Sequence, residues 1–207
     1  MRKYKKTSAF KSFFLAHINL YTFLFILFIV GVVVGIFHSY FLGNEAKTES
    51  YTYINTFLSA LKTKKLDSNI LFNEFLITNL RPAIFLWLFG LWIIGIPLIC
   101  IYIAFEGYAL GFVIAVVINS IGVKKGCLLL GFAVLPQEIF VIPILLTLGV
   151  NSILFAKAIW KLKGHSSAIK FDIYRYVFLF VLGVATLISI TLIQVYIGVP
   201  VIKNVIT

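Results

Sequence analysis

The sequence predicts an all-α integral membrane protein, a polytopic helical bundle of about five transmembrane helices with one helix broken by prolines. Three observations predict this fold class. Hydrophobic residues make up 61% of the 207 residues and charged residues only 12%, whereas soluble domains are about 45–50% apolar and about 25% charged. Basic residues gather in short clusters beside long apolar stretches, and one of these stretches contains a carboxylate and two prolines. We expect residues 1–207 to form a single membrane domain.

The first predicted span is Leu20–Leu42, which is almost entirely apolar. About 20 apolar residues in a helix cross the roughly 30 Å hydrocarbon core of a membrane. Five basic residues and no acid precede this span in Met1–Lys11. A cleaved signal peptide is the alternative. Because the apolar core of a signal peptide is only about 7–15 residues long, we expect an uncleaved helix.

Residues 43–81 form a polar segment, which we expect to be an extracytoplasmic amphipathic segment. Four of its apolar residues recur at helical spacing: Ile54, Phe57, Leu58 and Leu61. Ser68 or Asn69 is expected to begin a second, short helix, because both residue types cap helix N-termini. The segment is therefore predicted to lie on the membrane surface, or to dock on the bundle or on a partner.

Two further spans are predicted between residues 82 and 123. The first is Pro82–Phe105, since proline is tolerated in a first helical turn, and Gly95-Ile96-Pro97 predicts a kink inside it. The second is Gly107–Val123, separated from the first by a corner at Glu106. If Gly107–Val123 is only a re-entrant segment, the number of spans falls to four.

The last part of the chain predicts two more spans and a basic loop. Lys124-Lys125-Gly126 is expected to form a tight turn before the fourth apolar segment, Cys127–Leu148. Residues 151–162 are expected to continue that helix past the headgroups, and residues 176–198 to form the last span. Residues 157–175 are predicted to form a basic cytoplasmic loop. Lys and Arg are enriched in cytoplasmic loops, so this loop and the basic N-terminus place the N-terminus in the cytoplasm and the C-terminus outside.

The stretch from Leu135 to Pro143 holds the strongest polar signal. It places Pro136, Gln137, Glu138 and Pro143 in an otherwise apolar segment. An acid within a span costs about 2.5–3.5 kcal/mol on insertion scales, and each proline removes a backbone donor. Two interpretations are open. Gln137 and Glu138 line a cavity or bind a proton or cation, or they form a latch that satisfies exposed carbonyls and fixes helix packing.

Two further candidates lie near the predicted corner. Glu106 is expected to be solvated there at the level of the headgroups. Gly107 and Gly111 form a Gly-x-x-x-Gly pair, a spacing that lets helix backbones approach closely. We expect this pair to serve close packing within the chain rather than dimerisation.

The sequence carries no signature of a catalytic, cofactor or metal site. Cys100 and Cys127 lie in apolar runs, and the three histidines are scattered. The net charge of +11 is explained by membrane topology and by contact with anionic lipid headgroups rather than by nucleic acid. We therefore expect a non-enzymatic protein with membrane lipid around it and no nucleic-acid partner.

Several stretches, taken in order, resemble the stage II sporulation protein M family. A basic N-terminus and one span are followed by a polar segment ending in Phe75–Leu80, in which Asn79 is similar to the family. Gly95–Pro97, Phe105–Phe112 and Leu135–Pro143 come next. The wider family often has Leu-Pro-His-Gly-x-Phe-Glu-x-Pro-Ala in the last motif. Here its His, Gly and Glu are replaced by Gln137, Glu138 and Val141, which is more similar to the sporulation branch, and its final Ala is replaced by Ile144.

The resemblance implies a non-enzymatic role in engulfment, in which the mother-cell membrane migrates around the forespore. In this branch, the family member is the multi-pass cell-membrane scaffold of a complex with two peptidoglycan-degrading partners, a lytic transglycosylase and an amidase/endopeptidase. It would anchor these enzymes at the septal membrane. The alternative is a small transporter, channel or permease subunit, with Glu138, Gln137 and Glu106 on an ion or substrate path.

Overall fold

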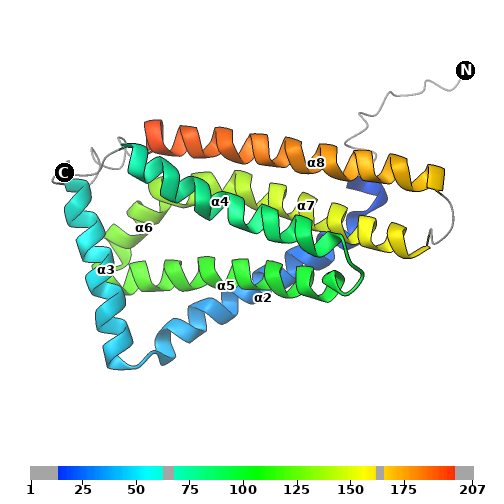
Figure 1. The fold of residues 1–207 in the computed structure, drawn as a ribbon. Coiled ribbons are helices and arrows are strands. Elements are labelled where there is room, and N and C mark those ends of the chain that lie inside the picture. Colours follow the sequence, from blue (N-terminus) through cyan, green and yellow to red (C-terminus); the bar gives the residue numbers. More distant parts are fainter. Residues whose placement is uncertain (1–13, 63–67, 162–165, 199–207) are drawn as a thin grey trace, which may run out of the picture.

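The structure, a computed structural model, describes residues 14–62, 68–161 and 166–198, and this part of the chain is helical without strands (Figure 1). Its elements are α2 (Ile18–Phe41), α3 (Asn44–Lys62), α4 (Ser68–Gly90), α5 (Gly95–Ile121), α6 (Val123–Ala133), α7 (Leu135–Lys161), α8 (Ser166–Ile193) and the π-helical η1 (Gln194–Gly198). Four stretches are long and apolar enough to cross a membrane: Ile18–Phe41, Gly95–Ile121, Leu135–Lys161 and Asp172–Tyr196. The predicted all-α membrane bundle is therefore confirmed, with four strongly apolar spans in the described residues.

Five helices, α2, α4, α5, α7 and α8, run along the bundle, whereas α3 and α6 lie across one end of it (Figure 1). We call this end the α3 end. At the opposite end, termed the far end, α2 begins, α4 passes to α5, and α7 finishes (Figure 1). The bundle thus has two ends of different character, one covered by helices and one that holds the turn between α4 and α5.

Helix α4 is the fifth member of the bundle, although it is less apolar than the four spans. It packs against α7 and α8, and its Ala83 and Leu86 side chains are fully buried. The helix starts at Ser68, where a helix start was expected, but it continues to Gly90 with Pro82 in its interior. The prediction that Pro82 begins a span is therefore wrong, because packing against α7 and α8 offsets the cost of an internal proline.

The predicted corner at Glu106 is also wrong. Helix α5 is continuous from Gly95 to Ile121, and the chain turns instead at residues 91–94. A Cβ atom on Gly95 would overlap the carbonyl oxygen of Phe89, so only glycine fits this turn. Pro97 then falls in the first turn of α5, where its missing donor is harmless, and it does not kink a longer helix.

The fourth apolar segment is broken next to Pro136, as the prolines predicted. Helix α6 ends at Ala133 and α7 begins at Leu135, while Pro143 lies inside α7. Lys124-Lys125-Gly126 does not form a tight turn, because these residues belong to the first turns of α6. The turn is made by Gly122, whose φ of 82° is a conformation that glycine adopts without strain.

The two last helices are longer than predicted. Helix α7 runs on to Lys161, in agreement with the expected continuation past the headgroups, and α8 begins at Ser166, well before Tyr176. The basic residues of the N-terminus and Lys163 lie outside the described part of the chain.

Two hydrophobic clusters hold the helices together. The larger one joins α2, α4, α5, α7 and α8 and includes Leu24, Leu86, Ile99, Val150 and Leu187, all fully buried. The smaller one lies at the α3 end, where Leu71, Val117, Leu129 and Leu130 are buried and Ile54 of α3 packs against them. The predicted amphipathic helix is thus α3, docked through Ile54. The side chains of Phe57, Leu58 and Leu61 lie outside the described part.

Candidate functional site within the bundle

A chain of three polar side chains links three helices inside the bundle. The Gln137 amide on α7 donates to Asn79 Oδ1 on α4 over 2.8 Å. The Asn79 amide in turn donates to Thr191 Oγ1 on α8 over 2.9 Å, and the Thr191 hydroxyl donates to the Leu187 carbonyl over 2.9 Å. Asn79 and Thr191 are buried. Because buried polar groups are costly when unpaired, this chain fixes α4 against α7 and α8.

The break before α7 places Gln137 and Glu138 at this position. The Glu138 amide donates to the Val134 carbonyl over 3.1 Å, so the backbone of the break is partly satisfied locally. Glu138 lies in the first turn of α7, where the positive end of the helix dipole favours a carboxylate. The two interpretations of this pair, latch or ion site, both stay predictions. Gln137 bonds another helix, whereas Glu138 faces other charges.

The charge that acts on Glu138 is that of Glu106, and Glu106 in turn interacts with Arg81. Glu106 lies roughly 16 Å along α5 from Gly95, which is near the middle of that helix and not at a headgroup-level corner. It accepts a hydrogen bond from Tyr102 one turn earlier, and it interacts electrostatically with Arg81 on α4. Glu138 lies close enough to Glu106 for the two carboxylates to repel each other. One arginine and two glutamates from three helices thus share one region of the bundle.

The interior beside Glu106 is closely packed. Glu106 borders a cavity of about 10 Å³, otherwise lined by apolar side chains of α2, α4, α5 and α7 such as Phe28, Leu86 and Ile142. A volume of this size holds one water molecule at most. This cavity beside Glu106 is therefore too small for anything larger than an ion or a water molecule.

Four glycines bring α2 and α5 into backbone contact, the most extensive contact between described elements. They form two Gly-x-x-x-Gly pairs: Gly31 and Gly35 on α2, and Gly107 and Gly111 on α5. A Cβ atom added to any of them would overlap a carbonyl oxygen of the other helix, those of Ala104, Tyr108, Phe28 and Val32 respectively. Residue numbers rise together along this contact, so the two helices are parallel. Small residues on both sides allow this approach.

The same contact is extended toward the α3 end by a polar pair. His38 Nδ1, near the end of α2, is hydrogen-bonded to the Tyr108 hydroxyl of α5. The Tyr108 ring also stacks with Phe105 and Phe112 along α5. The glycine contact and this pair together fix the rotation of α2 relative to α5.

The predicted site residues thus fall into separate groups. Asn79 and Gln137 are bonded to each other, Glu106 and Glu138 interact electrostatically, and Gly107 and Gly111 contact α2. Pro143 sits within α7, where the Thr147 hydroxyl donates to its carbonyl over 2.8 Å. Sequence reasoning did not select five residues that complete these groups: Gly31, Gly35, Arg81, Tyr102 and Thr191. Among the described residues, no group of His, Cys, Asp and Glu is arranged to hold a metal ion.

Comparison with known proteins gives one match. A family model described as stage II sporulation protein M matches residues 24–197, which extend from α2 to η1. No curated protein and no solved structure matches the chain.

Proposed function

Because the chain belongs to the stage II sporulation protein M family, and is thus a sporulation-related multi-pass membrane protein, we propose that it is the membrane scaffold of the engulfment complex. In this role it anchors peptidoglycan-degrading enzymes, a lytic transglycosylase and an amidase/endopeptidase, at the septal membrane. The observation that carries the proposal is the family match over most of the chain. The hydrophobic cluster that joins α2, α4, α5, α7 and α8 supports it, because a scaffold needs a rigid bundle.

The proposed orientation places the far end in the cytoplasm and the α3 end outside. Basic residues near the far end, such as Lys157 and Lys161 of α7, support it through the positive-inside rule. In cells carrying a variant without Cys100 and Cys127, a Trp92→Cys side chain should be shielded from a membrane-impermeant thiol reagent. A Tyr53→Cys side chain should react at once, since both positions are highly exposed, at 74% and 76%. The reverse labelling pattern would refute this orientation.

Deletion of the gene tests the proposed function directly. In an endospore-forming host, the deletion strain is expected to form a septum and then to stall before the mother-cell membrane surrounds the forespore, while vegetative growth stays normal. Fluorescent membrane staining over the time course of sporulation measures this. A complementing copy should restore engulfment. Complete engulfment without the gene would contradict the scaffold role.

The second candidate function is a small ion-coupled transporter or permease subunit. The grouping of Arg81, Glu106 and Glu138 from three helices favours it, since charged groups within spans often mark ion or proton paths. The two candidates differ in what they require of the acids. An ion or proton path needs a carboxylate that can titrate, whereas a scaffold needs only balanced charge. Variants that restore the charge balance without the carboxylate therefore distinguish the two functions.

A further inference from the structure

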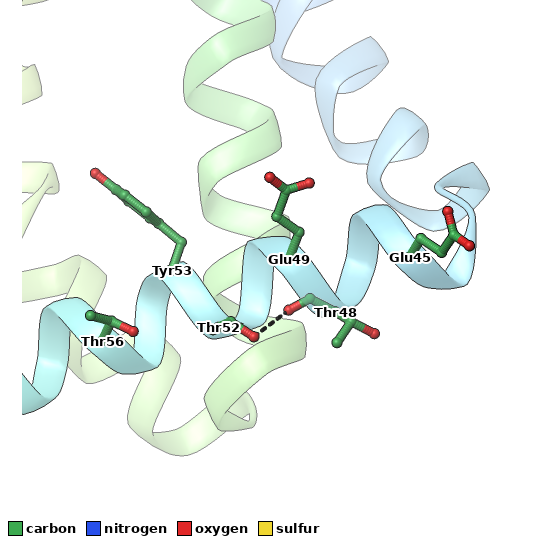
Figure 2. A pocket seen from close by; sticks show the side chains of 6 residues that line it. All are labelled: Glu45, Thr48, Glu49, Thr52, Tyr53 and Thr56. Carbon is green, nitrogen blue, oxygen red and sulfur yellow. Dashed lines mark hydrogen bonds between the residues drawn. The ribbon is translucent and has the colours of Figure 1, made fainter.

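One face of α3 is open and hollowed. Six residues line a shallow depression that is wide open to its surroundings: Glu45, Thr48, Glu49, Thr52, Tyr53 and Thr56. They recur at helical spacing, so they share one face of the helix. Figure 2 shows the Glu45, Glu49 and Tyr53 side chains projecting to the same side of α3. We call this surface the α3 hollow.

Most residues of the α3 hollow are not strong helix formers. Glu45 and Glu49 are spaced i, i+4, and like charges at this spacing destabilise a helix by about 0.2–0.5 kcal/mol. Threonine is a weaker helix former than alanine or leucine, and three threonines lie on this face. The Tyr53 side chain is 76% exposed. Glu45 lies in the first turn, where the helix dipole favours a carboxylate, so the exposed Tyr53 ring is the feature of this face that helix stability does not explain.

The charge of the α3 hollow is negative, although the chain as a whole has a net charge of +11. Glu45 and Glu49 are both exposed. The lysine between them, Lys47, does not line the hollow, and its ammonium donates to the Tyr40 carbonyl at the end of α2 over 3.2 Å. Two carboxylates therefore face the hollow while the neighbouring cation is engaged elsewhere.

We propose that the α3 hollow docks a basic segment of a partner protein on the outer side of the membrane. The inference rests on the proposed function, which supplies a protein partner on that side. Lysine or arginine side chains one helical turn apart would pair with Glu45 and Glu49. A guanidinium or an apolar side chain would cover the Tyr53 ring. An anionic lipid surface is disfavoured as the occupant, because the two carboxylates would repel its headgroups.

A photo-crosslinking amino acid at Tyr53 of the full-length protein, in sporulating cells, tests the docking surface. The crosslinked peptide, identified by mass spectrometry, is expected to come from a wall-facing protein and to contain lysine or arginine. The double variant Glu45→Lys/Glu49→Lys should lower the crosslinking yield at least about tenfold, since like charges across an interface exclude a partner. Glu74→Lys is the matched control, because Glu74 is an exposed acid on α4 outside the hollow, and it should leave the yield unchanged.

Reversal of the partner's charge completes the test. Glutamates in place of the basic residues of the crosslinked peptide should restore the yield in the double-lysine variant and lower it in the unmodified chain. If the double-lysine variant does not accumulate in the membrane, Glu45→Gln/Glu49→Gln serves instead, with an expected severalfold loss. Crosslinks confined to lipid or to the chain itself, or a yield that charge reversal does not change, would overturn the inference.

Co-purification of wall hydrolases separates this inference from the proposed function. If hydrolases co-purify equally well with the unmodified chain and the double-lysine variant, the docking surface is wrong and the scaffold stands. If the charge-reversal pattern appears with a protein that is not a wall hydrolase, the docking surface stands and the proposed partners are wrong.

Discussion

A Gly107→Leu variant is expected to lose nearly all folded protein from the membrane. The Cβ position of Gly107 overlaps the Phe28 carbonyl oxygen of α2, and a backbone oxygen cannot move aside as a flexible side chain can. The helices must therefore separate along their whole glycine contact. Overpacking a core typically destabilises a protein by about 1–3 kcal/mol. Because Gly107→Leu separates two backbones, we expect its destabilisation to be at or above the upper end of this range. Protein level in membranes and thermal stability in detergent measure the effect.

Gly131 provides a matched control for this change. It also lies in a helix, α6, but no heavy atom comes within 4 Å of its Cβ position. Gly131→Leu should therefore accumulate normally, and Gly131→Ala should be neutral or slightly stabilising because alanine favours helix by about 1 kcal/mol over glycine. Equal levels of Gly107→Leu and Gly131→Leu would show that the contact between α2 and α5 does not hold the bundle together.

Removal of the Arg81 charge should have the second largest effect. Arg81→Leu leaves Glu106 without the cation that interacts with it, and Glu106 and Glu138 still repel each other. An uncompensated charge within a span costs about 2.5–3.5 kcal/mol on insertion scales, so the membrane level and the sporulation function of this variant should fall sharply. Arg81→Lys, which keeps the charge, should be much milder.

A second substitution makes this prediction specific to charge balance. Glu106→Gln removes one carboxylate and keeps a hydrogen-bonding side chain of similar shape, so the pair Arg81→Leu/Glu106→Gln should recover most of the lost protein and function. An ion or proton path would require the carboxylate itself. Recovered protein with no recovered function, together with an inactive Glu106→Gln single variant, would favour the transporter candidate over the scaffold.

The first span could be predicted closely from the sequence, because a long apolar stretch between polar residues is typical of a transmembrane helix. The first span was expected at Leu20–Leu42 and is observed at Ile18–Phe41. The connection between α4 and α5 could not be predicted in the same way. The turn contains no residue type that usually forms turns, because its residues are Leu91, Trp92, Ile93 and Ile94. Apolar side chains are tolerated in a turn at the end of a membrane helix, since they can lie in lipid. Glu106-Gly107 looks like a turn in sequence but lies inside α5, where Tyr102 bonds the carboxylate.

Individual residues of the candidate site could be predicted from the sequence, but the contacts between them could not. Asn79 and Gln137 each stood out as polar residues near apolar segments, yet they are 58 positions apart, and no local pattern indicates that they are bonded. Thr191 looks like any threonine in an apolar helix, because its hydroxyl can always donate to its own helix. Gly31 and Gly35 have the same spacing as Gly107 and Gly111, but nothing in the sequence indicates that the two pairs pack against each other.

The parallel contact between α2 and α5 also has a consequence for the order of events during synthesis. Roughly 50 residues, from Leu42 to Ile94, separate the two helices. At about 5–20 residues per second, α2 waits in the membrane for roughly 3–10 s before α5 has even begun to leave the ribosome. Throughout that interval its glycine face meets lipid, the insertion machinery or the α2 of a neighbouring nascent chain. During synthesis, α5 therefore competes with helices that are already in the membrane for contact with the glycine face of α2.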